Sequence, residues 1–266
     1  MSIARASSPS THAAETVRGF GRYWALVWQT FGWTFRRSVP SGQLSEQAFR
    51  LGVRSVPVVL TTGLFTGMVL AVQSYEQFAQ LQMQSMIGAL VAMSMFKELG
   101  PVLTALMLAG RVGSAMAAEL GTMKVTEQVD ALRALGCDPI HFLVVPRFVA
   151  SVLLTPVLTI LANAVGIAGG WLVGVQLLHI DNHYFWQHAA QYAQTWDILA
   201  GVAKAFVFGG IIATICCYKG LNSGQGAEGV GQATTSANVL SCMMILVVNF
   251  FLALVITTLY RALYGG

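Results

Sequence analysis

Five long apolar runs limit what this chain can fold into. A helix needs about 20 apolar residues to cross roughly 30 Å of hydrocarbon. The runs that reach this length cover approximately residues 56–73, 86–118, 143–178, 198–217 and 239–259. Only 10% of the 266 residues are charged, whereas about 25% are charged in a typical soluble domain. The sequence therefore predicts an all-α membrane protein with five transmembrane helices.

The runs at 86–118 and 143–178 are longer than one crossing requires. Splitting either run into two crossings would leave almost no residues for the turn. We therefore expect each run to be one helix that tilts, protrudes or kinks. Pro101 and Pro156 are the expected kink sites, because proline interrupts the helical hydrogen-bond pattern.

Basic residues predict the orientation of these helices, because cytoplasmic segments of membrane proteins are enriched in lysine and arginine. Seven arginines precede the first run, and the connectors 119–142 and 218–238 also carry basic residues. The connectors 74–85 and 179–197 carry no lysine or arginine. We therefore expect the N-terminus and the two basic connectors to be cytoplasmic, with Arg261 as a minor exception.

An amphipathic helix is expected before the first run. We expect residues 1–15 to be flexible. We expect no signal peptide, because the first 55 residues lack an uninterrupted apolar core. Within 16–55, an apolar stripe and an opposite polar face recur at helical spacing. The stripe comprises Phe20, Tyr23, Trp24, Val27, Trp28, Phe31 and Phe35, and the polar face Arg18, Arg22 and Gln29. This pattern predicts a helix in the cytoplasmic membrane interface. The alternative is a core-facing helix of a small soluble domain.

Among the polar residues inside the apolar runs, we single out Lys97, Glu98, Lys204 and Asn249. Ionisable groups at that depth are costly, and they generally face a cavity or a partner rather than lipid. One interpretation is a polar patch that lines a path between helices and contacts a charged head group. The other is a structural ion pair, such as Glu98 with Lys204, that fixes helix packing. The two interpretations are compatible.

Small residues repeat every four positions in two of the runs, a pattern that lets helix backbones approach closely. The third run contains Gly166, Gly170 and Gly174, and the second contains Gly110, Ser114 and Ala118. Each ladder predicts either a homodimer interface or close packing within one chain. Close packing within the chain is the simpler interpretation of either ladder taken alone.

The cytoplasmic connector between the second and third runs predicts a short amphipathic helix over about residues 123–136. Its apolar stripe comprises Val125, Val129 and Leu132, and its exposed faces carry Glu127, Asp130 and Arg133. Asp130 and Arg133 are spaced to form an ion pair. This helix is expected either to dock a soluble partner or to rest its stripe on the membrane.

The sequence contains no motif for catalysis or cofactor binding. The glycine-rich segment 219–238 lacks both the GK[ST] ending and the preceding strand of a phosphate-binding loop. If this protein moves a substrate with ATP, a separate ATPase subunit must therefore bind the ATP and Mg²⁺. An interfacial helix with incidental histidines explains His179, Asp181, His183 and His188 better than a metal site does. The cysteines lack CxxC spacing, so we expect neither a disulfide framework nor zinc.

Two long segments resemble the signature regions of the MlaE family of ABC-transporter permeases. They are KELGPVLTALMLAGRVGSAMAAELGTMKVTEQVDALRALGCDPI at 97–140 and KGLNSGQGAEGVGQATTSANV at 219–239. The resemblance extends over nearly the whole chain beyond about residue 15. It implies a permease in the inner membrane of a Gram-negative bacterium. Such a permease moves phospholipids between the inner and outer membranes and maintains the lipid asymmetry of the outer membrane.

The resemblance also implies partners and residue roles. The permease would act as a homodimer with a pair of ATPase subunits, a STAS-domain protein and a periplasmic ring of MCE-domain subunits, and without nucleic acid. The cytoplasmic helix would be the coupling helix that contacts the ATPase. Its contact residues would be Val125, Glu127, Gln128, Asp130, Leu132 and Arg133, and the lipid cavity would contain Lys97, Glu98, Lys204 and Asn249.

Two other functions remain open on the residues alone. A secondary transporter or channel driven by an ion gradient would use Glu98 as a proton or cation carrier and would need no ATPase. A structural scaffold would anchor a soluble complex, and its intramembrane charges would be dispensable. The odd number of spans, without an inverted repeat, argues against an internally duplicated transporter and mildly for a homo-oligomer.

Overall fold

Helices form every regular element of the computed structural model, which describes residues 9–36 and 41–264 and the side chains of 18–34 and 42–262. Within those residues, five helical segments are long and apolar enough to cross a membrane. They are Gly42–Gln80, Gln84–Val125, Ile140–Leu177, Thr195–Leu221 and Gly226–Ala262. The predicted all-α architecture with five membrane helices is confirmed.

The elements follow one another in this order. The first part contains α1 (Pro9–Arg36), α2 (Ser41–Leu51), a 3-10 turn (Val53–Ser55) and α3 (Val56–Gln80). The second span contains a 3-10 turn (Gln84–Met86), α4 (Ile87–Ser94), α5 (Gly100–Leu108) and α6 (Ser114–Val125), with π-helical turns at Met95–Leu99 and Ala109–Gly113. Next come α7 (Gln128–Ala134), a π turn (Ile140–Val144), α8 (Val145–Trp171) and a second π turn (Leu172–Leu177). The chain ends with α9 (Asn182–Tyr192), α10 (Thr195–Leu221) and α11 (Gly226–Tyr264).

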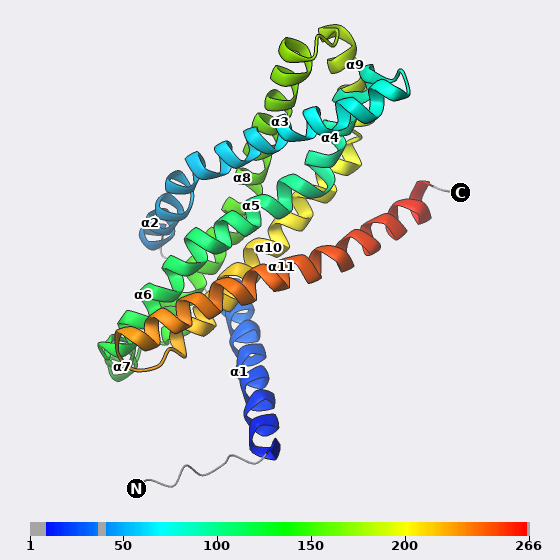
Figure 1. The fold of residues 1–266 in the computed structure, drawn as a ribbon. Helices are drawn as coiled ribbons and strands as arrows, with labels where there is room; N and C mark the ends of the chain where they lie inside the picture. Colours follow the sequence, from blue (N-terminus) through cyan, green and yellow to red (C-terminus); the bar gives the residue numbers. More distant parts are fainter. Residues whose placement is uncertain (1–8, 37–40, 265–266) are drawn as a thin grey trace, which may run out of the picture.

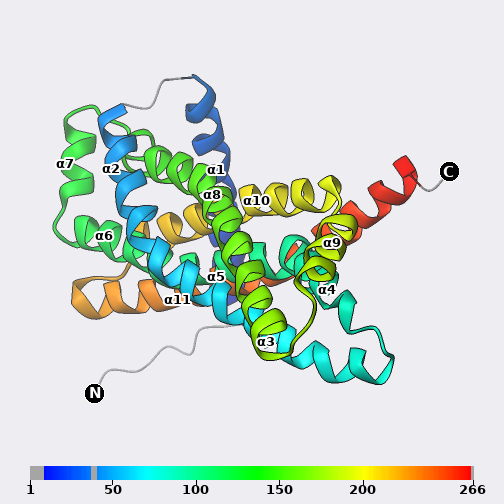
Figure 2. The same cartoon turned by 90° about the horizontal axis from the view of Figure 1, so that it is seen from above.

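The spanning helices form an elongated bundle with distinct ends. The two views place α7 at one end and α9 at the opposite end (Figures 1 and 2). The helix α1 projects out of the bundle (Figure 1). Near the C-terminal end of α11, the Tyr260 hydroxyl donates to Gln194 Oε1, just before the start of α10, at 2.9 Å. The two connectors that contain α7 and α9 are therefore separated by the length of the bundle.

Two expected connectors are partly helical. The helix α3 continues to Gln80, and α11 begins at Gly226, so most of the glycine-rich segment 219–238 belongs to the fifth span. The expected boundary of the connector 218–238 is wrong because its alanine, glutamine and glutamate residues favour helix despite the glycines. Gly226 starts the helix with a φ of 73°, a conformation that glycine adopts at little cost.

The regular α-helix is interrupted near one predicted kink site, Pro101, and is continuous through the other, Pro156. A π-helical turn at Met95–Leu99 comes immediately before α5, in which Pro101 is an early residue. This turn breaks the regular hydrogen-bond pattern of the second span close to the expected position. The helix α8, in contrast, continues through Pro156.

The glycine ladder of the third span packs within the chain. A Cβ atom on Gly67 of α3 would overlap the carbonyl oxygen of Gly166, and one on Gly63 would lie 2.7 Å from the Ala162 carbonyl oxygen. Gly170 approaches the Val91 side chain of α4 in the same way. Further along, a Cβ on Gly174 would meet the ring of Phe185 in α9, 3.4 Å away. The ladder therefore explains why α8 can lie against α3 and α4.

This backbone contact makes Gly67→Ala strongly destabilising. Its methyl group would collide with backbone atoms, which cannot rotate away, so we expect a loss of about 1–3 kcal/mol, as for other overpacked sites. Gly231→Ala in α11 is the matched control, because no heavy atom lies within 4 Å of its added Cβ. Thermal unfolding in detergent, followed by size-exclusion chromatography, measures both variants. Equal midpoints for the two variants would contradict the close packing of α3 on α8.

The ladder of the second span has a different environment. The segments that carry Gly110, Ser114 and Ala118 pack on α11, and Asn238 Oδ1 lies 3.9 Å from the position of a Gly110 Cβ. Gly110 itself is exposed. The contact with α11 is close packing within the chain. Because Gly110 is exposed, the homodimer interpretation of this ladder also stays open.

One side of α1 packs on the bundle. The helix begins at Pro9, earlier than the expected start near residue 16, and residues 1–8 lie outside the described part. Leu26 and Thr30 are buried, and the Tyr23 hydroxyl lies 3.1 Å from Thr214 Oγ1. Burial raises the pKa of the Tyr23 phenol above its ordinary value, so this side chain is neutral at physiological pH.

The rest of the α1 surface divides into an apolar and a polar side. The exposed aromatic side chains are Phe20, Trp24, Trp28 and Phe31, and Trp28 is 81% exposed. The side chains of Arg18, Arg22 and Gln29 are also exposed. A helix with one side on the protein, one apolar side and one polar side suits a membrane interface, which supports the predicted amphipathic pattern. The side chain of Phe35 lies outside the described residues.

Candidate functional site

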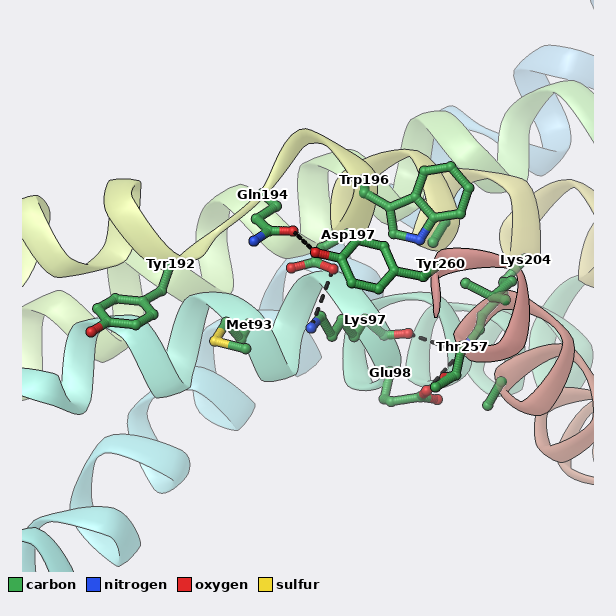
Figure 3. Close-up of a pocket in the computed structure, with 13 residues that line it drawn as sticks. Met93, Lys97, Glu98, Tyr192, Gln194, Trp196, Asp197, Lys204, Thr257 and Tyr260 are labelled. Atoms are coloured by element: carbon green, nitrogen blue, oxygen red, sulfur yellow. Dashed lines mark hydrogen bonds and ion pairs between the residues drawn. The ribbon is translucent and has the colours of Figure 1, made fainter. Parts of the chain in front are cut away.

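A pocket of about 240 Å³ lies between the second span, the start of α10 and the C-terminal half of α11 (Figure 3). Tyr192 of α9 also lines this pocket, and α9 lies at the end of the bundle opposite α7 (Figure 1). Four charged side chains line it: Lys97, Glu98, Asp197 and Lys204. Three of them are residues that the sequence singled out as intramembrane charges.

The four charges form two ion pairs. Lys204 Nζ donates to Glu98 Oε1 at 2.7 Å and also to the Lys97 carbonyl oxygen at 3.0 Å. Lys97 Nζ lies 3.2 Å from Asp197 Oδ1. The expected pairing of Glu98 with Lys204 is therefore present, and it lines a pocket, so the two interpretations of these charges hold together.

Each ion pair has one buried member and one open member. The side chains of Lys204 and Asp197 are 3% and 7% exposed, whereas those of Glu98 and Lys97 are 43–45% exposed. A buried charge is tolerated only when it is paired and hydrogen-bonded. The buried lysine and aspartate thus hold the two open charges in position at the pocket surface.

Asn249 completes the cluster from α11. Its Nδ2 donates to Glu98 Oε2 at 2.9 Å, so the Glu98 carboxylate receives one hydrogen bond on each oxygen. The structure thereby brings together the four residues expected at this site, Lys97, Glu98, Lys204 and Asn249. Three separate spans supply them, which gives the cluster a fixed geometry.

Local backbone structure explains how these spans meet. Lys97 and Glu98 lie in the π-helical turn Met95–Leu99, and such turns are frequent at functional sites. Gly201 of α10 faces this turn, and a Cβ there would overlap the Phe96 carbonyl oxygen. The absence of a side chain at Gly201 therefore lets α10 approach closely enough for Lys204 to reach both residues.

Asp197 is the site residue that sequence reasoning missed. It was assigned to the end of the connector 179–197, whereas α10 begins at Thr195 and places Asp197 in its first turn. Asp197, Gly201 and Lys204 are spaced by four and three residues, and all three are buried. This helical periodicity extends across the expected boundary and is the signal that would have identified Asp197.

The cytoplasmic helix expected over 123–136 is two helices instead of one. The helix α6 ends at Val125, Thr126 bonds back to the Thr122 carbonyl, and Glu127 adopts a left-handed φ of 59°. The helix α7 then starts at Gln128. A helix from about residue 123 was expected because Val125, Val129 and Leu132 are spaced as one helical stripe. Nothing in the local sequence indicates the left-handed conformation of Glu127, which is uncommon for glutamate.

The apolar residues of α7, Val129 and Leu132, pack on the bundle itself. Val129 is only 4% exposed and clusters with Leu26 of α1, Leu120 and Cys217, while Leu132 packs partly against them. Glu127, Gln128, Asp130 and Arg133 are exposed, and so is Val125. Arg133 Nη1 donates to Asp130 Oδ1 at 2.7 Å, as the spacing predicted. The stripe therefore fixes α7 to the bundle, and its polar residues face outwards.

An ionic network near α7 connects three elements. The buried Arg147 of α8 donates to Glu119 Oε2 at 3.1 Å and to the Leu143 carbonyl oxygen at 2.8 Å. Arg50 of α2 bridges Glu119 at 3.3 Å and Glu46 at 2.7 Å. Sequence reasoning did not identify this network, because nothing in a linear sequence pairs Arg147 with Glu119.

The other residues that were weighed for chemistry have structural roles. Asp181 caps α9 by accepting from the backbone of His183 and Tyr184, and His188 Nδ1 lies 3.0 Å from the Ser85 carbonyl oxygen. The segment around them contains the helix expected there. All four cysteines are free thiols, and Cys216 and Cys217 are buried in α10.

Comparison with known proteins decides the family. Residues 44–255 match the family model described as Permease MlaE. The chain belongs to the MlaE permease family. Because this family consists of ABC transporter permeases, the chain is a non-catalytic membrane subunit.

Several relatives share most of this MlaE-family chain. A probable ABC transporter permease protein of Rickettsia typhi is 46% identical over 209 residues, which cover 79% of this chain and 81% of the relative. The intermembrane phospholipid transport system permease protein MlaE of Haemophilus influenzae is 42% identical over 211 residues, covering 79% and 80%. The chloroplastic protein TRIGALACTOSYLDIACYLGLYCEROL 1 of Arabidopsis thaliana is 41% identical over 208 residues, covering 78% and 59%.

Proposed function

We propose that this chain is the permease of an ABC-type transporter that moves phospholipids between the inner and outer membranes and thereby maintains outer-membrane lipid asymmetry. One observation carries the proposal: a pocket with paired intramembrane charges, built by three spans at the end of the bundle opposite α7. Polar head groups need such charges at membrane depth, while acyl chains are compatible with the apolar helices around them. The printed name of the Haemophilus influenzae relative supports this cargo.

The distribution of charge supports an inner-membrane location with the N-terminus and α7 in the cytoplasm. Under this orientation, the pocket lies towards the periplasmic side. The exposed residues Glu127, Gln128, Asp130 and Arg133 would then contact the ATPase, which binds ATP and Mg²⁺ in place of this chain. A STAS-domain protein would join the cytoplasmic side, and a ring of MCE-domain subunits would receive lipid on the periplasmic side.

A homodimer would cover the apolar surface of α11. Only 11% of the most apolar window in this span is buried. Its exposed large side chains include Met243, Leu246, Val247, Phe250, Phe251 and Leu254. Because Asn249 and the pocket-lining residues Ala253, Ile256 and Thr257 belong to the same helix, a second copy would also bring two pockets near one another.

The second span provides a mechanical connection between the ATPase and the pocket. The helical segment Gln84–Val125 carries Lys97 and Glu98 in its first half and leads into α7 at its C-terminal end. Closure of the ATPase dimer would displace α7 and shift this segment between two packings, which changes the pocket. The network of Arg50, Glu119 and Arg147 would make α2 and α8 move together with α6.

A transport assay distinguishes this ATP-driven function from that of a carrier driven by an ion gradient. The permease is purified with its co-assembled subunits, reconstituted into proteoliposomes and supplied with acceptor vesicles and labelled phospholipid. We expect transfer that requires ATP hydrolysis and is unaffected by an uncoupler. Transfer that needs no ATP and stops when the ion gradient is dissipated would contradict the proposal and favour Glu98 as a cation carrier.

A further inference from the structure

We infer that the pocket selects zwitterionic phospholipid head groups, which carry both a phosphate and an ammonium group, over anionic ones. This inference rests on the proposed function and specifies its substrate class. The pocket presents one open cation, Lys97, and one open anion, Glu98, which are adjacent in the chain and similarly exposed (Figure 3). A head group with one charge of each sign matches this pair.

The buried charges explain the preference against anionic lipids. The two lysines, Lys97 and Lys204, and the two carboxylates, Glu98 and Asp197, sum to zero net charge. A zwitterionic head group leaves the pocket neutral, whereas an anionic head group adds a charge that no free cation balances. Such an uncompensated charge is costly in a partly desolvated site.

The open side chains retain bonding capacity in their present geometry. An ionised carboxylate has about four acceptor positions and a lysine ammonium three donors. Glu98 uses two of its positions, for Lys204 and Asn249, and Lys97 has one ion-pair partner, Asp197, at 3.2 Å. A phosphate oxygen can therefore bind Lys97, and an ammonium group can bind Glu98, while both ion pairs stay intact.

Aromatic rings supply a second feature that suits an ammonium group. Tyr192, Trp196 and Tyr260 line the pocket together with the charges. Trp196 and Tyr260 are neighbours with ring centroids 6.0 Å apart, and both lie above Lys97 and Glu98 in Figure 3. Ring faces attract cations, including quaternary ammonium groups. This environment favours the ammonium end of ethanolamine and choline lipids and adds nothing for an anionic glycerol head group.

Competitive lipid retention tests the inference. The complete complex is reconstituted into nanodiscs with equimolar phosphatidylethanolamine and phosphatidylglycerol of identical acyl chains, then extracted into mild detergent and analysed by lipid mass spectrometry. We expect phosphatidylethanolamine to be enriched about tenfold over its bulk ratio, the factor that one additional hydrogen bond to a charged group provides. Replacing phosphatidylethanolamine by phosphatidylcholine is expected to preserve an enrichment over phosphatidylglycerol.

Variants assign the preference to the open charges. Glu98→Gln is expected to remove the enrichment, and Lys97→Gln to lower retention of every phospholipid. Glu76→Gln, the same chemical change at an exposed position of α3, is the matched control and is expected to keep the enrichment. Full enrichment in Glu98→Gln would overturn the role of the open anion.

The wild-type protein alone distinguishes failure of the head-group inference from failure of the proposed function, so the test holds even if a variant does not fold. Retention of phospholipid in the bulk ratio would overturn the head-group inference and leave the proposed function standing. Absence of any retained phospholipid would count against both. Enrichment of phosphatidylglycerol would show that the pocket prefers anionic head groups and would also overturn the inference.

Discussion

Lys204→Met is expected to lower phospholipid transport by about tenfold or more while the permease still folds. The substitution removes the buried cation that donates to Glu98 Oε1 and to the Lys97 carbonyl oxygen. The four-charge cluster then carries one net negative charge, which repels a phosphate at short range, and a change of about 1.4 kcal/mol already corresponds to tenfold. Transport by the reconstituted complex measures the effect.

The free energy of unfolding of this variant is expected to fall by less than the loss of a fully buried ion pair would cause. Removing one partner of a fully buried ion pair costs about 3–5 kcal/mol. The Glu98 side chain is 45% exposed, so water replaces part of the lost interaction, and we expect a loss nearer to about 1–3 kcal/mol.

A double variant separates the two roles of this pair. Combining Lys204→Met with Glu98→Gln removes both charges and is expected to restore thermal stability without restoring transport. Transport that recovers together with stability would show that the pair only braces the helices.

Asp130→Lys is expected to weaken binding of the ATPase about tenfold to a hundredfold and to leave the fold of the permease unchanged. Asp130 is exposed on α7, while the helix is held to the bundle by the buried Val129. Reversal of a charge at an interface places like charges together, which costs several kcal/mol. Co-purification of the ATPase with the tagged permease at increasing salt concentrations measures the loss.

A charge swap tests whether binding of the ATPase depends on the charge at position 130 itself or on the ion pair between Asp130 and Arg133. Asp130 and Arg133 are paired at 2.7 Å, so Asp130→Arg combined with Arg133→Asp retains the pair and reverses its direction. If the ATPase contacts these positions, the swap fails to restore binding. If the pair only stabilises α7, the swap restores it, and unchanged co-purification of Asp130→Lys and Glu127→Lys would contradict the docking role altogether.

The sequence predicted those features that depend on local pattern. The five spans follow from apolar runs, and the Asp130–Arg133 pair follows from helical spacing. The cluster of Lys97, Glu98 and Lys204 was anticipated because charged residues inside a membrane span must find one another or a cavity. In each case the physical requirement acts within one helix or within the bilayer.

Features that depend on tertiary contacts were not predictable in the same way. Asp197 pairs with Lys97, which is 100 residues away, and Arg147 of α8 pairs with Glu119 of α6, a contact that only the folded chain creates. The break between α6 and α7 depends on a left-handed conformation at Glu127 that no glycine or asparagine marks. Pro101 predicted an irregularity in the second span, but not the π-helical form of the turn that orients Lys97 and Glu98.

Native mass spectrometry of the tagged chain, purified in mild detergent from its own membranes, tests the central claim most directly. We expect a complex that contains two copies of this chain, two ATPase chains and retained phospholipid. A single chain or a homo-oligomer without ATPase, under conditions that preserve other ABC complexes, would contradict the assignment of this chain as an ABC phospholipid permease.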